Sequence, residues 1–439
     1  MTRFRNFLLL AIFLLATALP CAFFLTRIGI HAANRGSKSF LLRGGATEIG
    51  GIPKKPSDTS FKSLLDWHLT QNNPCKIFTL EGAARCKHLF VWNIPSLQSA
   101  SAASYKLSSD MLAKAFYLPP MVAEETALQL TKNVAALALS PGNILYVIPP
   151  LRVAEDNRLA YNVFDFTDSF LNNVKRHLEQ TDIQVLDLRT APVLVGKPSS
   201  KIYFSTDHHM RGWTGHEIAQ IEAETLCDRF NLSIDTSLLS DENFSCQIFP
   251  SCFLGSHGRV LSRIPCPPDD FDLISYVHPL DLECLVVGKN KDITYKSGDA
   301  SILLDTQFFR APLYRGWRYS AYLGGDNPFT EIHNRSCTNN ISLLLIGDSL
   351  DNCVIPQLVP AVSRIVSIDP RHCNGLFAGA LRPGLPQELA LPFRQYIDSQ
   401  SFDAVLVQAI NDDLTTPINK LLAKTPTALA PSPGTPPRP

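Results

Sequence analysis

Short apolar runs recur along the chain and predict the strands of one sheet. Each run is four to six residues long, rich in Ile, Leu and Val, and bounded by Pro, Gly, Asp or Asn. Runs of this kind are typical of strands that are buried on both faces. The predicted strands cover residues 143–148, 183–188, 341–346, 365–369 and 404–407.

Helical periodicity fills the spaces between these runs. Residues 124–139 and 166–180 show apolar positions at helical spacing, and a third helix is expected after His209. In that third helix Ile218, Ile221 and Leu226 mark the apolar face, and the run from Thr214 to Glu217 fits a capping box. Alternating strands and helices predict an α/β fold with a parallel sheet covered by helices.

The middle of the chain breaks this alternation. Residues 234–335 are rich in Pro, Gly, Cys and aromatic side chains, and their short strand-like runs lack a helical period. We interpret this segment as a β-rich insertion or lid that lies over the same site.

The two ends of the chain differ from its centre. Residues 7–25 carry no charge and follow Arg3 and Arg5, so residues 1–26 are expected to be a signal peptide or a membrane anchor. Basic residues also follow the apolar run, so charge bias does not settle its orientation. Residues 27–60 have linker composition, and the Pro-rich residues 425–439 are expected to be a disordered tail. The α/β domain is predicted to cover residues 61–424.

Composition removes some classes of function. The chain has 439 residues and 45% apolar residues, which is enough for a large buried core. Lys plus Arg equals Asp plus Glu, at 40 each, so net charge gives no support for a nucleic-acid partner.

Cysteine usage leaves two interpretations open. Ten of the eleven cysteines lie beyond the apolar run, an even number that suits disulfides in an oxidising compartment. Several buried free thiols are the alternative. No Cys-x-x-Cys pair is present, which argues against a zinc site. The ten are Cys75, Cys86, Cys227, Cys246, Cys252, Cys266, Cys284, Cys337, Cys353 and Cys373.

The strongest candidate for chemistry is a serine at the end of a predicted strand. Gly347-Asp348-Ser349 follows the apolar run 341–346 directly. Such a turn lifts a hydroxyl to the carboxyl edge of a sheet, where open α/β folds bind ligands. A hydroxyl becomes a useful nucleophile only when a base takes its proton.

A candidate base lies upstream in Asp207-His208-His209. With a spacing of two residues, Asp207 and His209 can point to one side of an extended or turning segment. The carboxylate can then fix the imidazole tautomer and leave the other nitrogen free as a base. A solvated loop is one alternative. Another alternative is a metal site that also uses His216, as in the phosphoesterases that are named for an Asp-His-His motif. Those enzymes need an upstream Asp-x-Asp on a strand, which is not evident here.

A third element follows the last predicted strand. Asn411 comes shortly after residues 404–407 and could donate its side-chain amide to an oxyanion. Asn411 could equally be an ordinary turn residue or a helix cap.

Taken together, these motifs resemble the DHHW family of SGNH-hydrolase-like proteins, relatives of the alginate O-acetylation proteins. Five short segments match in the family's order, and with the flanking elements the resemblance spans about residues 120 to 412. The segments are Ile202-Tyr203-Phe204-Ser205-Thr206-Asp207-His208-His209, Cys252-Phe253-Leu254-Gly255-Ser256, Tyr322-Leu323-Gly324-Gly325-Asp326-Asn327-Pro328, Leu344-Leu345-Ile346-Gly347-Asp348-Ser349-Leu350-Asp351-Asn352, and Ile368-Asp369-Pro370-Arg371.

The resemblance implies an SGNH-like three-layer α/β/α core in which the Asp-His segment precedes the serine, a permuted order. It implies that Ser349 is the nucleophile, His209 the base and Asp207 its orienter, with Asn411, Arg371 and Gly347 at the oxyanion or substrate. No metal and no cofactor are implied. Three positions depart from the pattern, since Met210 stands where the family has Trp, Gly347 where it often has Lys, and Ala409 where SGNH enzymes have Gly.

These observations lead to an exported or membrane-tethered serine esterase or O-acyltransferase that acts on glycan acyl groups, most simply O-acetyl. Expected partners are a carbohydrate, an acyl-donor membrane protein and the membrane itself, through the N-terminal segment. The rival hypothesis is a non-catalytic glycan-binding or polysaccharide-assembly protein that keeps the fold. The departure at Met210 favours the rival, and the complete Asp-His-Ser set opposes it.

Overall fold

The structure is a computed structural model, and its described residues between 105 and 259 and between 266 and 418 belong to one compact unit. The predicted signal or anchor segment 1–26, the linker 27–60 and the tail 425–439 lie outside the described residues, so these predictions stay untested. The described residues are 105–107, 111–113, 120–137, 143–153, 165–261, 263–290, 292–373, 376–377, 385–408 and 418.

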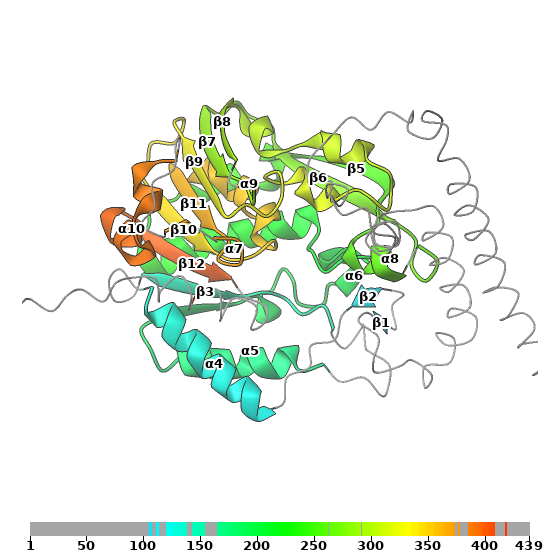
Figure 1. Ribbon diagram of the computed structural model, residues 1–439, viewed down its shortest axis with the longest axis horizontal. Coiled ribbons are helices and arrows are strands. Elements are labelled where there is room, and N and C mark those ends of the chain that lie inside the picture. The colour runs from blue at the N-terminus through cyan, green and yellow to red at the C-terminus, as the bar shows by residue number, and fades with distance from the viewer. Residues whose placement is uncertain are drawn as a thin grey trace, which may run out of the picture. The chain divides into compact units, whose positions relative to one another are not determined.

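An eight-stranded sheet forms the centre of the unit, in the order β4-β3-β12-β10-β11-β9-β7-β8 (Figure 1). Five adjacent strands, from β4 to β11, are parallel to one another. Along the chain the eight strands are β3 (Ile144–Ile148), β4 (Gln184–Asp187), β7 (Leu282–Val287), β8 (Ile293–Gly298), β9 (Phe329–Asn334), β10 (Ser342–Ile346), β11 (Arg364–Ile368) and β12 (Ala404–Gln408).

The predicted fold class is therefore confirmed as α/β with a mainly parallel sheet. All five strands predicted from apolar runs are present, each within one or two residues of its expected bounds. All five belong to the parallel part of the sheet, in which β3, β10 and β12 are fully buried and β4 and β11 are partly buried.

Alternate side chains of each strand enter two separate cores, which defines three layers. In β10, Leu343 and Leu345 belong to one core, and Leu344 and Ile346 belong to the other. This alternation follows from the two-residue period of a strand. Helices α7 (Gly212–Phe230) and α9 (Ile355–Leu358) contribute to the first core, and helices α4 (Pro120–Ala135), α5 (Thr167–Leu178) and α10 (Phe393–Ser399) contribute to the second. Figure 1 shows α4 and α5 side by side.

The segment expected as a β-rich insertion at about 234–335 contains five strands, which belong to two different sheets. Strands β5 (Phe244–Phe253) and β6 (Asp269–Tyr276) form an antiparallel ribbon of their own. Strands β7, β8 and β9 instead extend the main sheet as its antiparallel end. The segment is thus partly built into the core sheet, and its status as a separate insertion remains a prediction.

The remaining described elements are short. Strands β1 (Tyr105–Lys106) and β2 (Leu112–Ala113) pair with each other. The other short elements used below are α6 (Ser199–Ile202), α8 (Ser256–Leu261) and the 3₁₀ turns η9 (Arg318–Ala321) and η10 (Asp351–Cys353).

The helix predicted after His209 is present, but the predicted capping box is wrong. Helix α7 begins at Gly212, and its N-cap is Arg211, whose side chain makes no capping hydrogen bond. Thr214 lies inside the first turn, where its hydroxyl donates to the Lys201 carbonyl oxygen at 3.3 Å. The local pattern was right for a helix start, but contacts with α6 moved that start upstream.

Two further predictions, a membrane-spanning segment and disulfides, can be tested only within the described residues. No helix in the described part of the chain is both long and apolar enough to cross a bilayer, and residues 7–25 lie outside that part. Six cysteines of the described residues are free thiols, so disulfides are not supported for them: Cys227, Cys246, Cys252, Cys284, Cys337 and Cys353.

Candidate active site

A tight loop between α6 and α7 carries Asp207, His208 and His209. Tyr203 and Met210 form an antiparallel bridge across its base, and the Phe204 N–H donates to the His209 carbonyl oxygen at 3.2 Å. At the tip, the His209 N–H donates to Asp207 Oδ1 at 3.2 Å, which is an Asx turn. This turn, rather than an extended strand, places the two side chains on one side.

The element that precedes this loop is a short helix. The chain enters from helix α6, so the loop joins two helices. Met210, the position at which the family pattern has Trp, is fully buried in the core at the base of the loop. The change from Trp to Met therefore affects packing beneath the loop rather than an exposed surface.

Ser349 lies just beyond the carboxyl end of β10, where it meets the Asp207–His209 loop. Its Oγ is 2.7 Å from His209 Nε2, across 140 positions of sequence. His209 Nδ1 is 2.7 Å from Asp207 Oδ1. The structure thus brings the three candidate catalytic side chains into one hydrogen-bonded line.

The far oxygen of Asp207 is held by the backbone of another segment. The Ser256 N–H donates to Asp207 Oδ2 at 2.6 Å. A side chain at Gly255 would collide with Asp207, so only glycine allows this close approach. Backbone contact at Oδ2 and imidazole contact at Oδ1 together fix the plane of the carboxylate.

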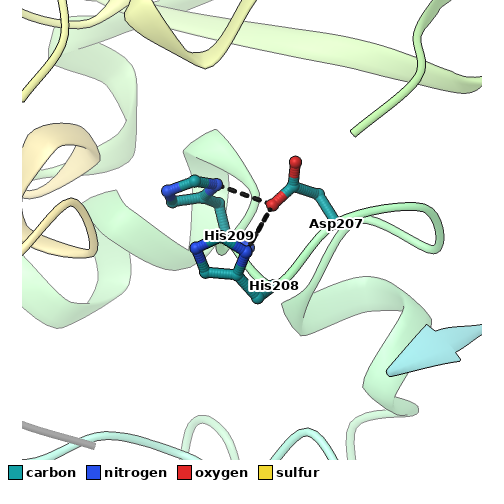
Figure 2. Close-up of side chains that lie close together, drawn as sticks. All are labelled: Asp207, His208 and His209. Carbon is teal, nitrogen blue, oxygen red and sulfur yellow. Dashed lines mark hydrogen bonds and ion pairs between the residues drawn. The ribbon is translucent and has the colours of Figure 1, made fainter. Parts of the chain in front are cut away.

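His208 shares the Asp207 carboxylate with His209. Its Nδ1 is 3.0 Å from Asp207 Oδ1 and 3.0 Å from Ser256 Oγ. Figure 2 shows both imidazole rings directed at the same carboxylate oxygen. The two rings differ in exposure, because 46% of the His208 side chain is exposed and only 12% of the His209 side chain is.

An aromatic side chain completes the packing of the candidate base. The Tyr319 ring, from η9, stacks on the His209 imidazole with centroids 3.8 Å apart and planes at 19°. The His208 ring lies 3.9 Å from the His209 ring. His209 therefore contacts aromatic rings of both residues, which restricts rotation of its side chain.

Burial and charge act in opposite directions on this line of groups. Burial alone would raise the pKa of Asp207, but His209 and His208 hold that pKa well below its usual value. Burial, together with the charge of His208, lowers the pKa of His209 below its ordinary value despite the attraction of Asp207. The arrangement therefore favours a charged Asp207 beside a neutral His209, which is the state a general base needs.

Gly347 lies between β10 and the serine, and the structure explains why it is glycine. Its N–H donates to the Ile368 carbonyl oxygen at 3.2 Å, which ties the turn to β11. The space that a side chain would occupy is filled by the carboxyl group of Asp351. Burial raises the pKa of Asp351 well above its usual value, as expected for an acid packed against backbone.

Arg371 lies beyond the carboxyl end of β11, the strand next to β10. Its guanidinium binds Asp369 through two hydrogen bonds, of 2.9 and 2.7 Å, and remains partly exposed. Arg371 is thus at the expected edge of the sheet, already paired with one carboxylate. Asn411, the predicted oxyanion donor, lies outside the described residues.

Two groups in the described part of the chain place potential metal-ligating atoms within 4.8 Å of one another. The first is Asp207, His208 and His209, in which the Nδ1 atoms of both imidazoles already contact the Asp207 carboxylate. The second is Asp326, Asp369 and His372, in which Lys289 and Arg371 already pair with the two carboxylates. An ion would have to displace these contacts in either place.

Sequence analysis missed several of these contributors. Tyr319 gave no signal, because it lies within the segment expected as an insertion. Gly255 and Ser256 stood in a segment that matched the family, and a Gly-Ser pair after an apolar run was the signal available there. Asn352 donates to Asp326 at 3.1 Å and links the serine turn to the chain ahead of β9, a contact that no local pattern indicates.

Comparison with a family model confirms the predicted resemblance. The model described as DHHW protein matches residues 193–368, which include Asp207, His209 and Ser349. Comparison with curated proteins finds no match.

Solved structures share the fold at low sequence identity. A DHHW family protein from Eubacterium siraeum matches with a TM-score of 0.51 and 16% identity, over 71% of this chain and 91% of that one. Bacillus cereus PatB1 matches with a TM-score of 0.53 and 15% identity, over 70% and 95%. The O-acetyltransferase domain of Pseudomonas putida AlgJ matches more loosely, with a TM-score of 0.39 and 13% identity, over 73% and 99%. The first two show that this chain shares their α/β fold.

Proposed function

We propose that this protein is a serine esterase or O-acyltransferase that acts on ester-linked acyl groups, most simply O-acetyl groups, of a glycan. The observation that carries the proposal is the line from Ser349 Oγ through His209 to Asp207, with 2.7 Å at both steps. A hydroxyl, an imidazole and a buried carboxylate in this order are the parts of a proton relay for acyl transfer.

The first half-reaction follows from the geometry. Ser349 Oγ attacks the carbonyl carbon of the acyl donor while its proton moves to His209 Nε2. The positive charge that forms on the imidazole is stabilised by Asp207 at Nδ1. When the tetrahedral intermediate collapses, the bond to the leaving oxygen breaks and His209 returns the proton to that oxygen. An acyl-Ser349 ester remains.

The second half-reaction reverses these proton movements. Water or a sugar hydroxyl loses its proton to His209 Nε2 and attacks the acyl-Ser349 carbonyl. Collapse of the second intermediate returns the proton to Ser349 Oγ and releases the acid or the acylated sugar. Transfer rather than hydrolysis requires that the sugar hydroxyl reaches the ester before water does.

Stabilisation of the oxyanion is assigned to the start of the serine turn. The Ser349 backbone N–H and the Asn411 side chain are the proposed donors, and Gly347, which packs against the Asp351 carboxyl group, begins the turn. One preorganised donor contributes about 3 kcal/mol to lowering the barrier. Arg371, partly exposed on the next strand, is the proposed contact for the substrate.

The substrate class and location rest on the family resemblance and the N-terminus. Likeness to the DHHW family supports chemistry on glycan acyl groups. The charge-free residues 7–25 support export, with the N-terminal segment either cleaved or retained as an anchor. An exported acyltransferase needs an acyl donor outside the cytoplasm, so a membrane protein that supplies acyl groups is the proposed partner.

Labelling with a fluorophosphonate probe tests the proposal directly. The folded protein should react, and Ser349→Ala should abolish labelling because the activated oxygen is gone. Ser363→Ala is the matched control: the Ser363 hydroxyl bonds to Cys337 and Asn339 just before β11, at the opposite end of the parallel strands from Ser349, and its labelling should equal that of wild type.

The same experiment distinguishes the proposed enzyme from the rival hypothesis. A folded protein that takes up no probe, and releases no acetate from p-nitrophenyl acetate, supports a non-catalytic glycan-binding or assembly protein. Met210 is the departure that favours this rival, and its burial at the base of the loop leaves the Asp207–His209–Ser349 line intact.

A further inference from the structure

One imidazole in the site has no part in the reaction described above. His208 Nδ1 approaches Asp207 Oδ1 at 3.0 Å, and His209 Nδ1 approaches the same oxygen at 2.7 Å (Figure 2). In the usual relay a carboxylate serves a single imidazole. Here two imidazoles divide one oxygen, with ring centroids 3.9 Å apart.

The two imidazoles occupy different environments although they share a partner. Nearly half of the His208 side chain is exposed, so water can reach it and supply a proton. His209 is buried between His208 and Tyr319, and its second nitrogen faces Ser349. A proton added to the pair is therefore solvated better on His208 than on His209.

We propose that His208 is a positioning residue for the reaction: it shares the Asp207 oxygen with His209 and, when it carries a proton, keeps His209 neutral and able to act as a base in acid. This inference rests on the proposed function, because it assigns a regulator to the same base. It adds to the relay a group that touches neither the substrate nor Ser349.

The charges around the pair are consistent with this assignment. Burial alone would lower the pKa of His208, but Asp207 outweighs burial and the pKa of His208 is raised. Burial lowers the pKa of His209, and the charge of His208 lowers it further, against Asp207 and Asp326. His208 therefore takes up its proton before His209 as the pH falls.

Groups on other elements also face the two imidazole rings and affect their protonation. His257 lies 5.9 Å from the His208 ring, and Tyr319 covers His209. Asp348 favours a proton on His208, whereas Arg152 disfavours it. The groups that face the pair are Asp207 on its own loop, Ser256 and His257 on α8, Tyr319 on η9, Asp326 ahead of β9, Asp348 and Ser349 after β10, and Arg152 after β3.

The sign of the effect follows from Coulomb repulsion. A cation at His208 makes a second proton on His209 costly, so the pH at which the base is lost moves down. Replacing His208 with a neutral side chain removes this cation and gives His209 the whole carboxylate oxygen. Both changes raise the pKa of His209, so the acid limb of the pH profile should move to higher pH.

A pH profile of ester hydrolysis tests the inference in the full chain. In His208→Gln, the ratio of kcat/KM at about pH 5.5 to that at about pH 8 should fall at least about threefold, because the base is lost earlier. His208→Lys restores a cation at this position and should recover most of the wild-type ratio. A purely structural role for His208 would instead lower kcat/KM by the same factor at both pH values.

His333 provides a matched control. It has nearly the same exposure, 47%, and its Nε2 is 3.0 Å from the Glu331 carboxylate, but it lies on β9 away from the pair. His333→Gln removes a half-exposed histidine from a carboxylate without touching Asp207. Its pH profile should match that of wild type.

A second measurement is independent of catalysis. NMR titration of the histidine ring protons, with His209 assigned through the signal lost in His209→Gln, reports protonation of His209 directly. In wild type the His209 signal should also shift while His208 titrates, because the rings share a carboxylate. In His208→Gln this early shift should vanish and the His209 titration should move to higher pH.

The two measurements separate failure of the inference from failure of the proposed function. If no ester is hydrolysed but the NMR titration moves as expected, the proposed function is wrong and the role of His208 stands. A His209 titration that is unchanged in His208→Gln, with no coupling in wild type, overturns the inference whatever the activity.

Discussion

Two regions of this molecule carry an acid and a histidine at the same spacing, and of these two pairs only one has a serine hydroxyl at the second nitrogen of its imidazole. Asp207 and His209 are joined by a hydrogen bond of 2.7 Å in the loop before α7. Glu331 and His333 are joined by one of 3.0 Å on strand β9. Sequence spacing alone does not distinguish these two pairs.

What differs is the rest of the environment. His209 is buried and its second nitrogen faces Ser349, whereas 47% of the His333 side chain is exposed. The shared oxygen also has a different second partner. Glu331 Oε1 binds Arg364, a permanent cation, at 2.7 Å, while Asp207 Oδ1 binds His208, which titrates.

The comparison teaches that the chemistry of an acid-x-histidine pair is set by its third and fourth partners. On β9 the permanent charge of Arg364 stabilises the carboxylate and leaves the histidine at the surface. In the loop, burial and a titratable neighbour keep the histidine neutral beside a charged acid. This contrast can be tested by four measurements.

Loss of the histidine should have the largest effect. In His209→Ala, kcat/KM for p-nitrophenyl acetate should fall by about 10⁵-fold, because nothing else takes the proton of Ser349. His333→Ala should hydrolyse this ester at the wild-type rate. Equal rates for His209→Ala and wild type would show that the base has been assigned to the wrong residue.

Loss of the acid's charge should have the next largest effect. Asp207→Asn keeps the shape but removes the charge that orients His209, and kcat should fall by about 10³-fold to 10⁴-fold. Glu331→Gln should leave kcat within about twofold, since its carboxylate serves β9 and Arg364. Steady-state kinetics of the two variants, each checked for folding by circular dichroism, make this comparison.

The pH dependence of wild type should reflect the lowered pKa of His209. The base must be neutral, so activity is present above that pKa and lost as the pH falls through it. The acid limb of kcat/KM should therefore lie below about 6.5, the ordinary value for histidine. A limb at or above the ordinary value would contradict the buried, His208-flanked environment of His209.

Backbone packing should give the smallest effect, measured as stability. Gly255→Ala places a methyl group against Asp207, and its free energy of unfolding should fall by about 1–3 kcal/mol. Gly316→Ala is the control, because its added carbon meets only the Arg318 side chain at 3.2 Å or more. Denaturant unfolding should show a clearly smaller loss for Gly316→Ala.

Much of the fold was predictable because its signals are local. Strands β3, β10 and β12 are buried along their whole length, so each appears as an almost continuous apolar run, and β4 and β11 keep a shorter apolar segment. Ser349 was identified because it directly follows one of these runs. Asp207 and His209 were predicted to point to one side of an extended or turning segment, and of these two alternatives the structure has an Asx turn.

The parts that escaped prediction depend on contacts between distant segments. Tyr319 reaches His209 only through the path of the chain from β8 to η9, which no periodicity encodes. Strand β7 joins the main sheet by pairing with β9, and β8 pairs with β7; a short antiparallel strand does not reveal its partner from composition. The true start of α7 depends on α6, a four-residue helix too short to show a period.

The close fit of the Asp351 carboxyl group against Gly347 has an evolutionary consequence. A side chain at position 347 and an acid at position 351 compete for one volume, so their mutational effects should be strongly epistatic. A lineage that acquired a lysine in place of Gly347 while it kept Asp351 would pass through a crowded, destabilised intermediate. One that first shortened Asp351 would pass through a cavity instead, so either order of the two changes costs stability.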